Sequence, residues 1–133
     1  MKKKIKVLFP DIDREISIEL DDSRSPKTVQ AILENLPIQV GITRWGDELY
    51  TEKTQIIAEE EEAKREVSFL DVAYWPEVNA LCLFYGPTPI SKNGKILAYS
   101  PVNIIGKILD SSNKHVILNQ IKERAKVIIR ESI

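Results

Sequence analysis

The chain has 133 residues, of which 43% are hydrophobic and 29% charged, and it carries a formal net charge of −1. That length predicts one domain over residues 1–133, large enough to bury roughly two thirds of its unfolded surface, and the small net charge excludes a molecule-wide attraction to nucleic acid or to an anionic membrane. The single cysteine, Cys82, and the single histidine, His115, exclude an internal disulfide, a cysteine-based zinc site and a multi-histidine metal site.

The first 20 residues predict a β-hairpin. Apolar residues alternate with polar ones twice, at Ile5, Val7 and Phe9 and again at Ile16, Ile18 and Leu20. Ile5, Val7 and Phe9 alternate with the lysines at positions 2, 3, 4 and 6. We interpret them as solvated lysines of an edge strand and not as a patch for RNA.

A helix follows the hairpin. Its apolar residues have a period of 3.6, at Val29, Ile32, Leu33 and Leu36. Ser25 is the expected N-cap and Pro26 the first helical residue. Pro37 ends the helix, because the residue before a proline avoids the helical conformation.

The remainder is short, β-rich segments with turn signals between them. We expect strands over residues 67–75, 80–85, 102–109 and 127–129, a tight turn at Asn93 and Gly94, and a second helix over residues 115–123. Many short strands with two isolated helices predict an all-β barrel whose ends the helices cover.

Two carboxylate features could carry chemistry. On a strand, Glu48 and Tyr50 share one face, and a carboxyl turned in among aromatic rings would have a raised pKa. The alternative is an exposed Glu48 beside a packed Tyr50. The acidic run at residues 59–62 is more simply a solvated loop than a cation site, since adjacent carboxylates cannot all converge on one ion.

Aromatic residues gather in one part of the chain. Seven of the nine aromatic residues lie between Trp45 and Tyr85, and the stretch at residues 72–90 also contains three prolines. Cys82 and Phe84 face away from Leu81, Leu83 and Tyr85, so both faces of that strand are apolar. The outer face is therefore either covered by a helix or forms the wall of a binding groove.

Three stretches, TRWGDELY, VAYWPEVNALCLFYGPTPIS and AYSPVNIIGKI, together resemble a small cyclophilin-like domain family of archaea and bacteria that has no assigned biochemical role. The resemblance covers most of the chain. It implies a mainly β fold, a closed eight-stranded antiparallel barrel with a helix capping each end.

The comparison with true cyclophilins, which isomerise the bond before proline, implies changes in the pocket. The phenylalanine of the proline pocket corresponds to Phe84 or Tyr85, and the pocket histidine to Val102. The pocket glutamine corresponds to Arg44, and the catalytic arginine falls on Leu36. An arginine that weakens amide resonance is thus missing, which disfavours isomerase activity.

We therefore predict a cytoplasmic protein that binds a small molecule or a proline-containing, extended peptide in an aromatic groove. An atypical prolyl isomerase and an oligomerisation module are the alternatives. No metal, cofactor, nucleic acid or membrane is expected, and the richness in Glu, Lys and Ile is typical of thermophiles. The expected ligand-binding residues are Arg44, Trp45, Glu48, Tyr50, Tyr74, Trp75, Phe84, Tyr85, Thr88 and Asn103.

Overall fold

The computed structural model describes residues 1–109, 118–121 and 123–132. Within them the chain forms nine strands, one α-helix and a short 3-10 turn. The elements are β1 (Lys2–Phe9), η1 (Pro10–Ile12), β2 (Arg14–Asp21), α1 (Pro26–Asn35), β3 (Ile38–Trp45), β4 (Glu48–Thr51), β5 (Lys64–Val67), β6 (Asp71–Trp75), β7 (Ala80–Phe84), β8 (Ile96–Ile108) and β9 (Ala125–Glu131).

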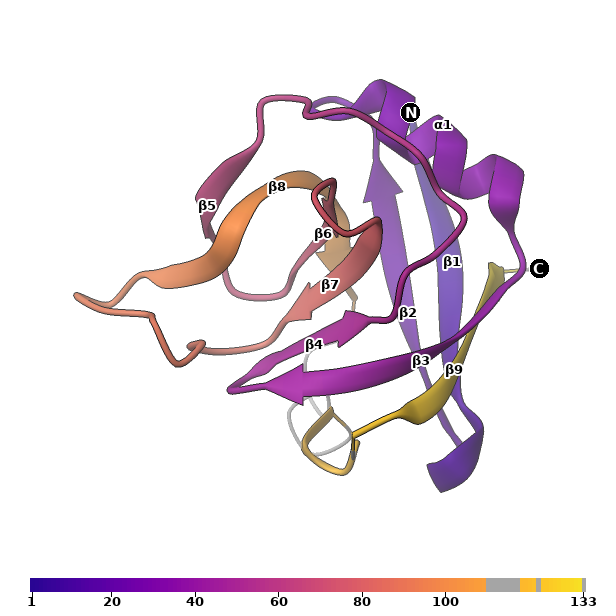
Figure 1. Ribbon diagram of the computed structural model, residues 1–133. Helices are drawn as coiled ribbons and strands as arrows, with labels where there is room; N and C mark the ends of the chain where they lie inside the picture. The colour runs from indigo at the N-terminus through magenta and orange to yellow at the C-terminus, as the bar shows by residue number, and fades with distance from the viewer. Residues whose placement is uncertain (110–117, 122, 133) are drawn as a thin grey trace.

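Eight of the strands close into an antiparallel barrel. Their order is β2-β1-β9-β3-β4-β7-β6-β8, and β8 pairs back with β2. A Cβ on Gly106 would collide with the carbonyl oxygen of Glu19, so β8 and β2 approach closely at this closing pair. The ninth strand, β5, lies outside the barrel and pairs with the first half of β8 (Figure 1). The prediction of a closed eight-stranded barrel is confirmed.

The helix α1 begins and ends where the sequence indicates. Ser25 is its N-cap and Pro26 its first residue, and it ends at Asn35, before Pro37. Its buried residues Val29 and Ile32 pack into the barrel core, so that α1 lies over one end of the barrel (Figure 1). The second capping helix, expected over residues 115–123, lies mostly outside the described residues, of which Leu118 and Asn119 are helical. The described part of the chain therefore has one α-helix.

Two strand predictions are wrong in detail. The first strand is not an edge, because β1 pairs with β2 on one side and β9 on the other. Lys2, Lys3 and Lys6 nonetheless pair with carboxylates at the surface, as Lys6 does with Glu15 at 3.4 Å. Residues 67–75 are not one strand, because a turn with a left-handed Leu70 (φ 71°) separates β5 from β6.

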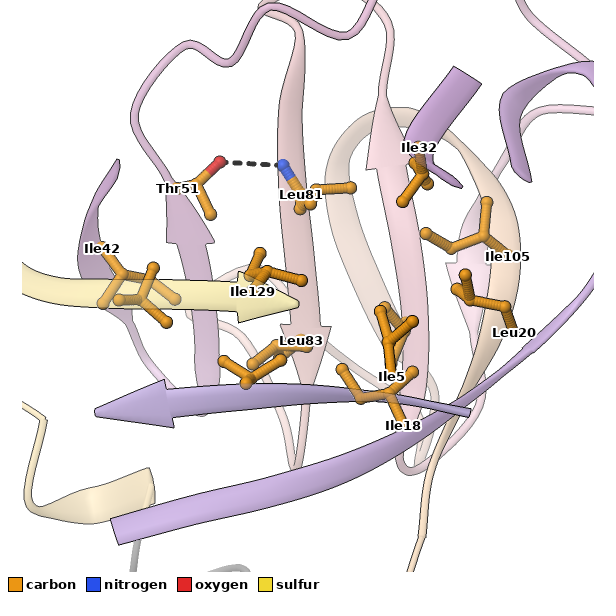
Figure 2. Close-up of a pocket in the computed structure, with 13 residues that line it drawn as sticks. Ile5, Ile18, Leu20, Ile32, Ile42, Thr51, Leu81, Leu83, Ile105 and Ile129 are labelled. Carbon is orange, nitrogen blue, oxygen red and sulfur yellow. Dashed lines mark hydrogen bonds between the residues drawn. The ribbon is translucent and has the colours of Figure 1, made fainter. Parts of the chain in front are cut away.

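The barrel interior is filled with aliphatic side chains. Ile18, Leu20, Leu83 and their neighbours leave a cavity of only about 20 Å³, into which the labelled isoleucines and leucines of Figure 2 point. Such a space equals about one water molecule, and an apolar cavity of this size stays dry. The one polar side chain at its wall, Thr51, accepts a hydrogen bond from the Leu81 amide at 2.9 Å (Figure 2). The interior of the barrel is therefore structural.

A second apolar cluster lies outside the barrel, on the outer face of β6, β7 and β8. Cys82 and Phe84 are fully buried there, although they point away from the interior. From the sequence we expected this outer face either to be covered by a helix or to form the wall of a groove. It is instead covered by β5 and the first half of β8, which place Val67, Ala98 and Val102 on this outer cluster.

Candidate functional site

The outer cluster contains a buried carboxyl group, that of Glu48. The residue begins β4 and stands opposite Trp45 of β3 and Phe84 of β7. Leu49 points into the barrel, so strand alternation turns Glu48 and Tyr50 to the outer face. Glu48 is only 3% exposed, and the alternative of a solvent-facing Glu48 is wrong.

Burial sets the protonation of this carboxyl group. Desolvation raises the pKa of Glu48 to about 7, as the sequence predicted in direction, and a hydrogen bond with the Cys82 thiol offsets part of the rise. Burial likewise raises the pKa of Cys82, so this side chain is a thiol that donates to the carboxylate. No described residue provides a hydrogen-bond partner for Oε1 of Glu48. A buried acceptor in this state is costly unless a ligand or solvent satisfies it.

Four aromatic rings form a row beside this carboxyl group. Trp45 contacts Tyr99 at a centroid distance of 6.0 Å, Tyr99 contacts Trp75 at 6.0 Å, and Trp75 contacts Tyr50 at 6.2 Å. The two end pairs are edge-to-face, with interplanar angles of 75° and 78°. Tyr99 is 62% exposed, whereas the other three rings are half-buried. We call these four residues the aromatic row.

The polar groups of the row also have defined positions. The indole N–H of Trp75 donates a hydrogen bond to Ser100, on the same strand as Tyr99. This bond fixes the Trp75 ring while its face remains in contact with Tyr99. The row is thus a pre-oriented aromatic surface with one mostly exposed member, Tyr99.

A separate groove of about 550 Å³ lies on the other side of the turn that joins β3 and β4. Gly46 of that turn has φ +63°, and a Cβ there would meet Pro89 and the Pro87 carbonyl oxygen. Residues after β7 hold the turn through the Asp47 amide, which donates to the Pro87 carbonyl at 2.9 Å. The groove is lined by Asp47, Phe69, Tyr85, Gly86, Pro87, Ser91, Lys92, Gly94, Lys95 and Ile96. Of the ten expected binding residues, it contains Tyr85 alone.

The structure brings five of the ten expected residues together. Trp45, Glu48, Tyr50, Trp75 and Phe84 share the outer face of β3, β4, β6 and β7. The other five are Arg44, Tyr74, Tyr85, Thr88 and Asn103, and the structure does not place them on this face.

Asn103 and Tyr74 form hydrogen bonds at the barrel end near α1. The Asn103 amide accepts from the Glu61 N–H at 2.8 Å and donates to Thr28 Oγ1 at 3.0 Å. Glu61 in turn accepts from the N–H of Thr28 at 2.7 Å and so caps α1. The pKa of Glu61 is lowered overall. Burial by itself would raise the pKa, but the hydrogen bonds from Thr28 and Lys27 have the larger combined effect. The Tyr74 hydroxyl donates to the Ile56 carbonyl at 2.8 Å. These polar groups are engaged within the protein.

Arg44 and Tyr85 lie at the opposite end of the barrel. Arg44 stands opposite Leu49, an interior residue, and donates to the Asn119 carbonyl at 2.9 Å. Burial raises the pKa of Tyr85, an effect that the neighbouring Arg44 partly offsets. Thr88 bonds to Ser91 in its own loop and donates to the Leu97 carbonyl at the start of β8.

The positions that correspond to an isomerase pocket are divided between the two faces. Val102 and Phe84 pack together in the outer cluster. Arg44 is directed to the other face, and Leu36 packs against the interior core. Phe84 itself is fully buried. The guanidinium and the accessible phenyl ring that proline isomerisation requires are not combined here.

Sequence reasoning missed Tyr99. Its segment begins β8 at Ile96, whereas the predicted strand began at residue 102. The alternation of Ala98, which is buried, with exposed Tyr99 was the available signal. In the part of the chain that the structure describes, no helix is long and apolar enough to cross a membrane, and no three His, Cys, Asp or Glu side chains are grouped to hold a metal ion.

Comparisons with known proteins match this chain to a family model and to solved structures. A family model described as cyclophilin-like matches residues 3–130. The solution structure of the hypothetical protein AF2241 from Archaeoglobus fulgidus is similar at 37% identity with a TM-score of 0.81, over 98% of this chain and 95% of that chain. The structure of McbB in complex with tryptophan has a TM-score of 0.74 at 15% identity, over 96% of this chain and 44% of that chain, and so shares the fold. The comparison with curated proteins gives no match.

Proposed function

The chain belongs to the cyclophilin-like family, and from that premise we propose that it binds a small molecule or an extended peptide on the aromatic row. The observation that carries the proposal is the row itself, with Trp45, Tyr99, Trp75 and Tyr50 in continuous ring contact at the surface. A monomeric protein seldom exposes contiguous aromatic surface without a partner.

The shape of the row favours a ligand that lies along it. Three successive ring contacts, each about 6 Å between centroids, form an extended aromatic surface and not a closed pocket. An extended chain or a flat apolar molecule can stack on several rings at once. The distant neighbour in complex with tryptophan is compatible with small-molecule binding by proteins that contain this barrel.

The residues of the site have different roles in this proposal. Trp45, Tyr50, Trp75 and Tyr99 supply the stacking surface, and the buried Phe84 supports it from below. Glu48 is the polar group that orients the ligand, because a mostly apolar site gains specificity from a few placed polar atoms. The groove beside the β3–β4 turn lacks such a carboxyl group with an unpartnered oxygen.

Tryptophan fluorescence and thermal shift against proline-containing peptides and small aromatic molecules test the proposal, because both tryptophans of the chain belong to the row. A hit should quench the fluorescence and raise the melting temperature. Tyr99→Ala should weaken binding about two- to tenfold, since stacking on one ring contributes about 0.5–1.5 kcal/mol beyond area burial. Phe69→Ala is the matched control, because Phe69 is also exposed (54%) but lies outside the row.

Two outcomes would contradict the proposal. The first is a flat response across the peptide and small-molecule sets. The second is a stable dimer in light scattering that Tyr99→Ala dissolves, since the row would then be an interface between two copies of the chain.

A further inference from the structure

Glu48 offers a recognition group that the stacking surface alone does not explain. Its side chain is 3% exposed and bonds to the Cys82 thiol, and Oε1 has no partner among the described residues. Its cross-strand neighbour Trp45 and its same-face neighbour Tyr50 are the two ends of the aromatic row. Glu48 is therefore a strand neighbour of the residues at both ends of the proposed binding surface.

We propose that the aromatic row selects ligands that carry a primary ammonium group, and that this group donates a hydrogen bond to Oε1 of Glu48. This inference rests on the proposed function and names the chemical class of its ligand. A free amine and a lysine side chain of a peptide share this chemistry.

Two physical features favour an ammonium over a neutral donor. Aromatic ring faces are negative and attract cations within about 6 Å, and several rings around one site add their effects. A charge-assisted hydrogen bond between N⁺–H and a carboxylate is roughly twice as strong as a neutral one. An ammonium also supplies the counter-charge that a buried carboxylate lacks.

Among the residues that the structure describes, no cation shifts the pKa of Glu48 and so none supplies that counter-charge. Cys82 of β7 is the titratable group that bonds to it, and Phe84 stands opposite. From β8 and β5, which cover this face, Ala98 and Val67 are the contributing residues, while Arg65 is exposed and donates to the Ala98 carbonyl. The ring of Tyr99 in the row is 62% exposed, so it can change rotamer without displacing the buried cluster.

The experiment compares 2-phenylethylamine with its neutral analogue 2-phenylethanol by calorimetric titration at pH 6 and pH 8. At pH 8 the amine should bind at least about tenfold more tightly than the alcohol. At pH 6, about one unit below the pKa of Glu48, the advantage should fall roughly tenfold, because most of the carboxyl is then protonated. Glu48→Gln should remove the advantage at both pH values.

Matched controls separate this site from general electrostatics. Glu77→Gln neutralises an exposed carboxylate in the turn after Trp75 and should leave the advantage unchanged. A lysine-containing peptide and its Nζ-acetylated form distinguish a peptide-borne ammonium from a free amine. If Glu48→Gln fails to fold, the comparison of amine and alcohol at pH 6 and pH 8 in the wild-type protein still tests the inference.

Each result decides a different question. Equal binding of amine and alcohol would overturn the ammonium inference and leave the proposed function intact. An advantage that persists in Glu48→Gln, or one that Glu77→Gln removes equally, would also overturn it. If neither probe nor peptide binds, the proposed function fails together with the inference.

Discussion

The two faces of the same sheet have opposite chemistry. The inner face is aliphatic, leaves about 20 Å³ of space and satisfies its polar side chain Thr51 within the protein. The outer face of β4 and β7 has aromatic rings and a buried carboxyl with an unpartnered oxygen, and the exposed ring of Tyr99 on β8 joins these rings in the aromatic row. Close packing with every polar group satisfied is what stability requires, whereas an orphan acceptor beside exposed rings is a cost that a binding function explains.

The largest expected effect tests the structural role of the inner face. Leu20→Ala should lower the free energy of unfolding by about 2–5 kcal/mol, because Leu20 is fully buried at the cavity wall. Tyr99→Ala on the outer face should change it by less than about 0.5 kcal/mol. Denaturant unfolding of both variants checks the contrast. A comparable loss in Tyr99→Ala would remove the distinction between the faces.

The next effect is the pH dependence that Glu48 imposes on stability. Its pKa is about 7 in the folded protein against an ordinary value of 4.5, so between these values the folded state binds a proton that the unfolded state has lost. The stabilising contribution of Glu48 to the free energy of unfolding is therefore fully present below about pH 4.5. It declines as the pH rises to about 7 and does not change further above that pH. The decline is on the order of 3 kcal/mol.

Glu48→Gln should remove this decline. The measurement is urea unfolding of wild type and variant at pH 5 and pH 8, taken as the difference between the two proteins so that other carboxylates cancel. An identical pH profile in both proteins would show that Glu48 is not a buried titrating group.

A smaller effect separates Asn103 from the binding face. Asn103→Ala should lower the free energy of unfolding by about 1–3 kcal/mol, because it leaves the Glu61 N–H and the Thr28 hydroxyl without their buried partner. Ligand affinity at the aromatic row should not change. If titration instead showed weaker binding with unchanged stability, Asn103 would belong to the binding site.

The smallest effect concerns the cap of α1. Glu61→Ala should cost about 1 kcal/mol, because Glu61 accepts hydrogen bonds from the first-turn amides of Lys27 and Thr28. Glu62→Ala is the matched control, since Glu62 is exposed in the same acidic run. Equal thermal shifts in the two variants would contradict a capping role.

Periodicity predicted the parts of the fold that depend on local sequence. The first hairpin, the start of α1 at Pro26 and the tight turn at Asn93 and Gly94 follow directly from alternation, capping residues and turn chemistry. The shared face of Glu48 and Tyr50 was also predictable from strand alternation, whereas the burial of Glu48 was one of two alternatives that the sequence left open. These are properties of neighbouring residues along one strand or turn.

The remainder depends on contacts between distant segments. The cover of the outer cluster by β5 and early β8 brings Val67 against Ala98, and no local pattern specifies that pairing. The assignment of Tyr99 to the aromatic row depends on the same cover. Asn103 and Tyr74 were assigned to the site by residue type, whereas their hydrogen-bond partners lie in other segments of the chain.

Ligand binding at the aromatic row of the outer face is the central proposal. The most direct test is a two-dimensional ¹H–¹⁵N NMR titration with 2-phenylethylamine and a proline-containing peptide, because the two indole N–H signals belong to Trp45 and Trp75. We predict that both indole signals shift with one saturating affinity, while the amides of Ser91 and Lys92 in the separate groove do not move. Shifts confined to that groove, with both indole signals unchanged, would contradict the account.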